Sequence, residues 1–167
     1  MSGPLQGPKD ASAEILAAVA AVRTFLGVPN ATEADERIHR PVADDRVDAG
    51  GNLIHPRPRI IIAQGPTLTR TKIGTTTFAS EGGTLFWSFE KDVSDPDDLR
   101  ASLAAFEAEL DAIWAGVEAI AGIGTAPSGN SYMNVEGFDL AAGPGTTDPE
   151  EEDGELFHGA MFLVEWR

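Results

Sequence analysis

The sequence predicts an α+β fold: a mostly antiparallel sheet of about four to six strands with two helices packed on one face. Two segments place apolar residues at helical spacing, and several others alternate apolar and polar residues with the period of a strand. The length of 167 residues fits one domain that can bury a core without disulfides. We place this domain at residues 10–167, and we expect residues 1–9, with two prolines and two glycines, to be disordered.

The first helix is expected from Ala11 to Leu26, because its apolar residues recur in steps of three and four and form one stripe. The stripe consists of Ile15, Leu16, Val19, Val22, Phe25 and Leu26. Gly27 and Pro29 are expected to end this helix. Residues 30–58 are polar and rich in turn-forming residues, so we expect a long, partly irregular connection there.

Residues 59–90 are typical of an antiparallel meander, with frequent β-branched residues between glycine-containing breaks. The expected strands are Arg59–Gln64, Leu68–Ile73, Thr75–Ser80 and Thr84–Glu90. Gly65-Pro66 is expected to break the first strand, and Glu81-Gly82-Gly83 is expected to be a turn. In the last strand Leu85, Trp87 and Phe89 share one side, which predicts a strongly buried face.

The second helix has the clearest pattern in the chain. Ser94 or Asp95 is expected to cap it, with Pro96 in the first turn, where a missing N–H costs no hydrogen bond. Its apolar seam is Leu99, Leu103, Phe106, Leu110, Ile113, Val117 and Ile120. We therefore expect a core helix that lies on the sheet and ends at Gly122.

A hairpin with a long tip is expected at the end of the sequence. Its strands are Ser131–Leu140 and Leu156–Trp166, of which the second has the stronger alternation. Residues 141–154 between them are rich in glycine, proline and acids, so we expect a mobile loop that cannot form a core.

The formal net charge of −15 argues against two classes of partner. Tight, sequence-independent binding to nucleic acid depends on Lys and Arg that neutralise phosphates, and docking on anionic membranes needs the same basic residues. The sequence has no apolar run of about 20 residues, as a membrane helix needs, and its first residues lack the pattern of a secretory signal. We therefore expect a protein that is made in the cytoplasm and binds neither nucleic acid tightly nor a membrane.

No motif in the sequence indicates catalysis, so we expect no enzymatic activity, no cofactor and no metal. There is no cysteine, and His39, His55 and His158 lack the spacing of a metal site. A nucleophile elbow, a P-loop and a dinucleotide fingerprint are also missing. The acidic stretch 148–155 lacks the alternating ligands and central glycine of an EF-hand loop and is better explained as a solvated loop. A hydrolase built on two converging acids stays an alternative.

Charge segregation instead suggests contacts, within the chain or between chains. Residues 57–72 hold bases and no acid, and residues 148–155 hold acids and no base. Phe86 and Phe157 fall on strand sides opposite the main core sets, where a neighbouring subunit could cover them. The candidate subunit interface is Arg57, Arg59, Arg70, Lys72, Glu150, Glu151, Glu152, Asp153, Phe86 and Phe157.

The order of the expected elements, together with three stretches of sequence, resembles the tail terminator proteins of long-tailed bacteriophages and gene transfer particles. These stretches are RPRIIIAQG (57–65), TLFWSFEKDV (84–93) and ELFHGAMFLVEWR (155–167). The resemblance is one of layout over residues 10–167 and includes no catalytic fingerprint. The size of segments 30–58 and 141–154 departs from it, which leaves another neck or tail role open.

The resemblance implies a structural protein of the virion, assembled in the host cytoplasm. Members of the family form a homo-oligomeric, six-fold ring that caps the tail tube and joins the tail to the connector of the head. The implied partners are further copies of the chain, the tail tube protein and head-tail connector proteins. The alternatives are another head-tail connector or tail-completion protein, or a small α+β enzyme or ligand-binding domain.

Overall fold

The structure is a computed structural model that describes residues 6–40, 56–73, 77–121, 135–142, 150–152 and 154–167. The helices are α1 (Gln6–Ala18), α2 (Ala20–Leu26), α3 (Ala31–Arg37) and α4 (Leu99–Ala121). The strands are β1 (Ile38–His39), β2 (Arg59–Ile73), β3 (Thr77–Asp92), β4 (Val135–Ala142), β5 (Glu150–Glu152) and β6 (Glu155–Trp166). The predicted α+β class is confirmed.

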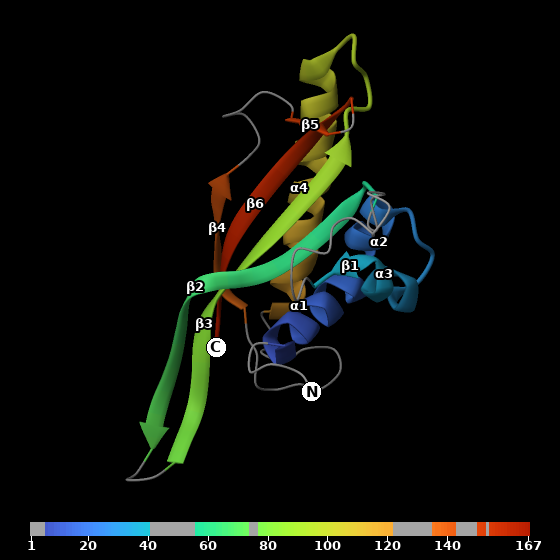
Figure 1. Cartoon of the computed structure of the whole chain (residues 1–167). Coiled ribbons are helices and arrows are strands. Elements are labelled where there is room, and N and C mark those ends of the chain that lie inside the picture. Colours follow the sequence, from blue (N-terminus) through green and yellow to red (C-terminus); the bar gives the residue numbers. More distant parts are fainter. Residues whose placement is uncertain (1–5, 41–55, 74–76, 122–134, 143–149, 153) are drawn as a thin grey trace, which may run out of the picture.

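The strands form one six-stranded sheet in the order β1-β2-β3-β6-β4, and β5 pairs with β6 beside this path (Figure 1). Every described strand pair is antiparallel except β1 with β2, which are parallel and meet at two residue pairs. The sheet is therefore mostly antiparallel, with a strand count within the predicted range. β6 lies between β3 and β4 and so holds the two halves of the sheet together.

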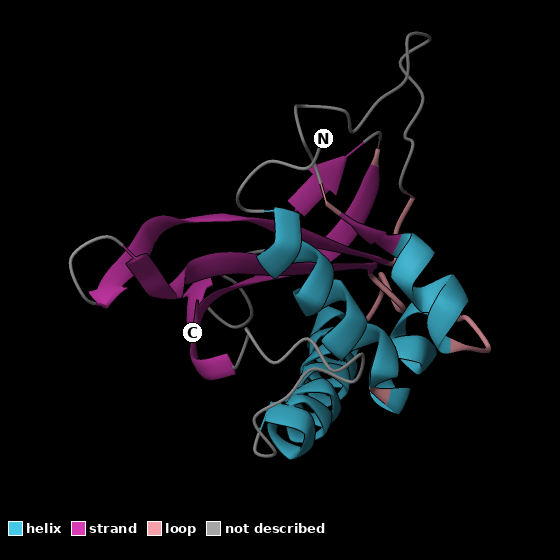
Figure 2. Cartoon of the chain, turned by 90° about the horizontal axis from the view of Figure 1, so that it is seen from below, coloured by secondary structure: helices cyan, strands magenta, loops and turns pink. Residues whose placement is uncertain are grey.

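The prediction of two helices is wrong, because the described residues form four. The described helices gather on one side of the sheet (Figure 2). The expected helix 11–26 is divided at Val19, whose extended backbone (φ −79°, ψ 122°) separates α1 from α2. α1 also begins at Gln6, so residues 6–9 are helical, whereas they were expected to be disordered. Residues 1–5 lie outside the described part of the chain.

Part of the expected irregular connection 30–58 is also ordered. α3 begins after Asn30, whose side-chain oxygen accepts a hydrogen bond from the Glu33 N–H at 2.9 Å, while the Asn30 amide donates to the Glu33 carboxylate. This reciprocal pair satisfies groups at the helix start in the manner of a capping box. β1 follows directly at Ile38. Residues 41–55, the rest of that segment apart from 56–58, are outside the described residues.

β2 and β3 are each longer than predicted, because two expected interruptions lie inside strands. Gly65-Pro66 does not end β2, and Gly82 and Gly83 lie within β3 opposite Thr69 and Leu68. The pairing absorbs the irregularity as a register shift between Gln64 and Leu68. A bulge of this kind bends a strand without ending it.

The predicted helix seam forms the core over the sheet. Phe106, Leu110, Ile113 and Val117 of α4 are buried against the side of the sheet that carries Trp87 and Phe89. Trp114 stacks on Phe138 of β4 at 4.1 Å between ring centroids. The start of the helix differs from the prediction: Asp98 accepts the Ala101 N–H at 3.0 Å and α4 begins at Leu99, so Pro96 lies before the helix.

Leu99, the first residue of the predicted seam, is exposed. The last predicted strand is confirmed almost to the residue as β6. Of the predicted strand Ser131–Leu140, residues 135–140 lie in β4, and residues 131–134 are outside the described residues. The expected loop 141–154 is wrong in part, because residues 141–142 belong to β4 and residues 150–152 form β5, while 143–149 and 153 are not described. Within the described chain, no helix is long and apolar enough to cross a membrane.

Candidate functional site

The distal halves of β2 and β3 form a two-stranded arm that leaves the body of the protein. We call residues 68–73 and 77–82 the arm. Its strands pair with each other from Leu68 opposite Gly83 to Ile73 opposite Thr77, but β6 joins β3 only from Gly83 onward. The arm extends beyond the helices and beyond the C-terminal end of β6 (Figures 1 and 2). Among the described residues no third strand accompanies it.

At the base of the arm the backbones of β2 and β3 are tightly packed against each other. A Cβ placed on Gly83 would lie 2.4 Å from the carbonyl oxygen of Thr67, and one on Gly65 would lie 2.6 Å from the carbonyl carbon of Thr84. The Thr84 hydroxyl accepts the Thr67 N–H at 3.1 Å and lies 3.0 Å from the Thr67 hydroxyl. Glycine is required here for close backbone approach, and the contact fixes the direction in which the arm leaves the sheet.

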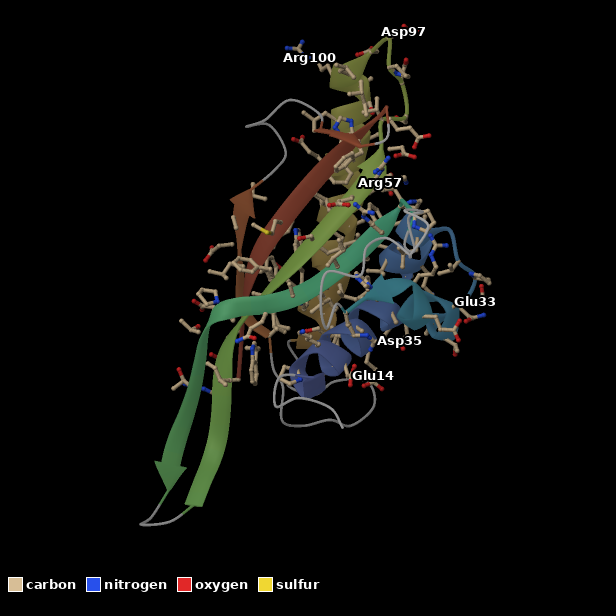
Figure 3. The ribbon with its side chains drawn as sticks, in the orientation of Figure 1. Glu14, Glu33, Asp35, Arg57, Asp97 and Arg100 are labelled. Carbon is tan, nitrogen blue, oxygen red and sulfur yellow. The ribbon has the colours of Figure 1, made fainter. Side chains whose placement is uncertain are left out.

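Arg57 joins three elements at the opposite end of the sheet (Figure 3). Its guanidinium donates to Asp92 at 2.6 Å and to Glu155 at 3.3 Å, and it lies 4.5 Å from the centre of the Phe157 ring. The Arg57 side chain is only 3% exposed. One predicted basic residue thus meets an acid of the 148–155 stretch within the same chain, with Phe157 buried beneath them.

Arg59 also forms its ion pair inside the chain. It is buried and forms an ion pair with Glu90, its partner on the neighbouring strand. Phe86 is half-buried on the sheet side opposite the core set, with Ala63 and Leu163 as register neighbours.

The remaining predicted interface residues lie at opposite ends of β6. Arg70 and Lys72 belong to the arm, whose base lies beside Trp166, whereas Glu150–Glu152 form β5 beside residues 155–157. Asp153 is outside the described residues. Arg70 and Lys72 therefore do not lie beside Glu150–Glu152 within one chain, and a contact between these segments of different chains stays a prediction.

A buried serine and histidine pair is the main polar feature that the sequence reasoning missed. The Ser102 hydroxyl lies 2.8 Å from His158 Nε2, and it accepts the Ser94 N–H at 2.9 Å. Phe106 stacks on the imidazole at 5.6 Å between centroids. Burial lowers the pKa of His158, and the nearby charge of Glu107 opposes this shift.

The geometry of the Ser102–His158 pair, which we call the latch, suits a structural contact rather than a catalytic nucleophile. Ser102 and His158 are both nearly inaccessible, and Ser102 already has a hydrogen-bond partner on each side. The latch ties the start of α4 and the preceding loop to β6. A sequence signal existed only in part, since a serine three residues after Leu99 on the inner face of a core helix is unusual but does not name its partner.

A hollow of about 500 Å³ between α1 and α3 is lined by Asp10, Glu14, Asp35 and Arg40 among other residues. Arg40 bridges its two sides, at 3.0 Å from Asp10 and 3.3 Å from Asp35. Glu14 and Asp35 lie near this position in Figure 3. No group of three His, Asp or Glu residues within the described chain is arranged to hold a metal ion.

Comparison with known proteins identifies no family: no family model matches the chain, and no curated protein matches it either.

Proposed function

We propose that this chain is a structural virion protein, a tail terminator that forms a homo-oligomeric ring, six-fold by the resemblance, on the end of the tail tube. The observation that carries the proposal is the arm. An isolated two-stranded ribbon is at best marginally stable in water, and its unpaired edges invite association. Such an arm fits a protein whose working state includes a neighbour that covers it.

Charge supports the same role. A net charge of −15 suits the wall of a passage for DNA, because an acidic surface does not retain the phosphate backbone. The Ser102–His158 pair is enclosed, so it offers no accessible nucleophile to a substrate. The proposed partners are further copies of the chain, the tail tube protein and the head connector proteins.

The test is whether the purified full-length chain forms closed rings of one size. Native mass spectrometry gives the number of copies, and electron microscopy shows whether they close. Purified tail tubes then show whether the chain binds one end and stops further tube growth. We expect rings alone or on tube ends. A chain that stays monomeric at high concentration and also with tail tubes contradicts the proposal, whereas rings that bind the connector but not the tube indicate another neck position.

A further inference from the structure

Several strand edges of this molecule lack a neighbour within the described residues, among them the outer edge of β3 at 77–82, and two of them are complementary. The first is the outer edge of β2 in the arm, because β1 accompanies β2 only at Ile60 and Ile61. The second is the outer edge of β4, which pairs through its other side with β6. Each edge presents backbone N–H and C=O groups that a further strand can pair with.

The two edges cannot meet inside one chain. β4 begins at Val135 opposite Trp166, and the arm begins at the same level, where Gly83 also lies opposite Trp166. From that level the arm and β4 extend in opposite directions (Figure 1). Since no other described strand pairs with either edge, a strand of another molecule can pair with each.

The residues on the two edges are complementary in charge. Segment 68–73 contains Arg70 and Lys72 and no acid, whereas β4 contains Glu136 and Asp139 and no base. The chain has 12 basic and 27 acidic residues, so a basic strand segment is the less common kind. In the register of the arm Arg70 lies opposite Glu81, and Lys72 lies opposite Phe78.

Both edges also expose a leucine. Leu68 at the base of the arm is 38% exposed, and Leu140 of β4 is 49% exposed. At ~3.3 Å per residue, the arm segment and β4 span about 20 and about 26 Å, so the shorter edge fits along the longer one. Backbone pairing and apolar contact would supply the affinity, and charge would select the partner.

We propose that the β2 edge of the arm adds as a strand to the β4 edge of the next copy. This inference rests on the proposed ring. The contact joins two different patches, so each copy offers one and receives the other, as a ring requires. Two β4 edges repel each other mainly through Asp139, since the Glu136 carboxylate lies 3.8 Å from the Arg167 guanidinium of its own chain. The two register shifts of β4 also disfavour unspecific pairing. Ring closure then leaves no open edge of either kind.

Charge reversal tests the pairing through self-association, measured by sedimentation. Lys72→Glu should weaken association by up to about fivefold, the range of one exposed ion pair. Asp139→Lys in the same chain should restore most of it. Arg100→Glu and Asp97→Lys are matched controls, since both positions are exposed and lie around the N-terminal end of α4, far from the arm (Figure 3). Equal weakening by Arg100→Glu, or no rescue in the double variant, overturns the pairing.

Cross-linking tests the neighbours directly, because the chain contains no cysteine. Thr71→Cys and Asp139→Cys chains are mixed and oxidised, and Thr69→Cys covers a shifted register. A disulfide needs Cα atoms about 4.4–6.8 Å apart, so at least one arm variant should form a heterodimer with Asp139→Cys. Thr71→Cys mixed with Asp97→Cys should form none. A Thr71→Cys dimer without the β4 partner shows arm–arm pairing instead and overturns the proposal.

The two failures are distinguishable. Rings that form normally in Lys72→Glu and give no arm–β4 cross-link leave the proposed function standing and remove this interface. A chain that forms no ring at all, even with tail tubes, removes both.

Discussion

Gly116 of α4 offers a sharp test of how closely the helices pack. A Cβ at this position would lie 2.3 Å from Val19 Cγ1 and 3.4 Å from Val19 Cβ. Val19 is the residue that separates α1 from α2, it is 4% exposed, and its β-branched side chain has little rotamer freedom. The contact places the break between the two helices directly against α4.

Two opposing effects set the outcome of Gly116→Ala. Alanine favours the helix by about 0.8–1.0 kcal/mol over glycine, whereas a methyl group forced into a packed contact costs about 1–3 kcal/mol. The net expectation is a loss of about 0–2 kcal/mol in the free energy of unfolding. In a Val19→Ala background the clash disappears, so the same substitution should stabilise by about 1 kcal/mol. The coupling energy between the two sites is therefore about 1–3 kcal/mol.

Urea unfolding of the original chain, the two single variants and the double variant measures this double-mutant cycle. The protein concentration is chosen in the range where the urea midpoint does not depend on it. Ala112→Gly, at an exposed position of the same helix, calibrates the propensity effect and should cost about 1 kcal/mol. If Gly116→Ala stabilises the original chain by about 1 kcal/mol and the two substitutions are additive, then α4 does not approach Val19 as closely as described.

Three further predictions concern the core and the buried polar groups. Leu110→Ala should lower the free energy of unfolding by about 2–5 kcal/mol, because Leu110 is 4% exposed; a thermal shift too small to measure would place it at the surface. His158 has a lowered pKa in the folded chain, so the unfolded chain binds the proton more tightly, and stability should fall as pH drops below about 6.5. Relative to a His158→Gln variant this loss should appear only below that pH, and a constant difference in stability from pH 8 to 5 would contradict it. Arg57→Ala should cost about 1–3 kcal/mol in urea unfolding, since it removes charged hydrogen bonds and the cover over Phe157; an unchanged midpoint would show that this cluster does not hold the sheet end.

The sequence predicted those elements whose pattern depends on burial by one large core. The apolar seam of α4 repeats over several turns, and apolar and polar residues alternate along β6. The spacing of apolar residues therefore predicts both this helix and this strand. α3 has a single buried residue, Ala34, and therefore no apolar period. Its start was visible only in the spacing of Asn30 and Glu33, which is a capping signal.

The interface candidates stay a prediction, because charge segregation along a sequence does not state which ion pairs form within the chain and which form between chains. Arg57 and Arg59 belong to the basic segment but are used inside the molecule, by Asp92, Glu155 and Glu90. The arm could not be foreseen, since Gly65-Pro66 and Gly82-Gly83 have the composition of turns. Only the register shows that both strands continue past these glycines, which allow the two backbones to lie close together.

The central place of β6 also has a consequence for synthesis of the protein. β4 has no strand partner other than β6 among the described residues, and β3 pairs along its inner half with the same strand. A nascent chain that has not yet released β6 from the ribosome can form the helices and the β2–β3 hairpin, but it cannot fix β4 in place. The pairing of β3 with β6, which joins residues 83–92 to residues 157–166, spans a long stretch of sequence and forms late in folding. Under the proposed arm–β4 pairing, a prematurely terminated chain would carry an arm but no ordered β4 edge, and it could attach to the next copy only through its arm.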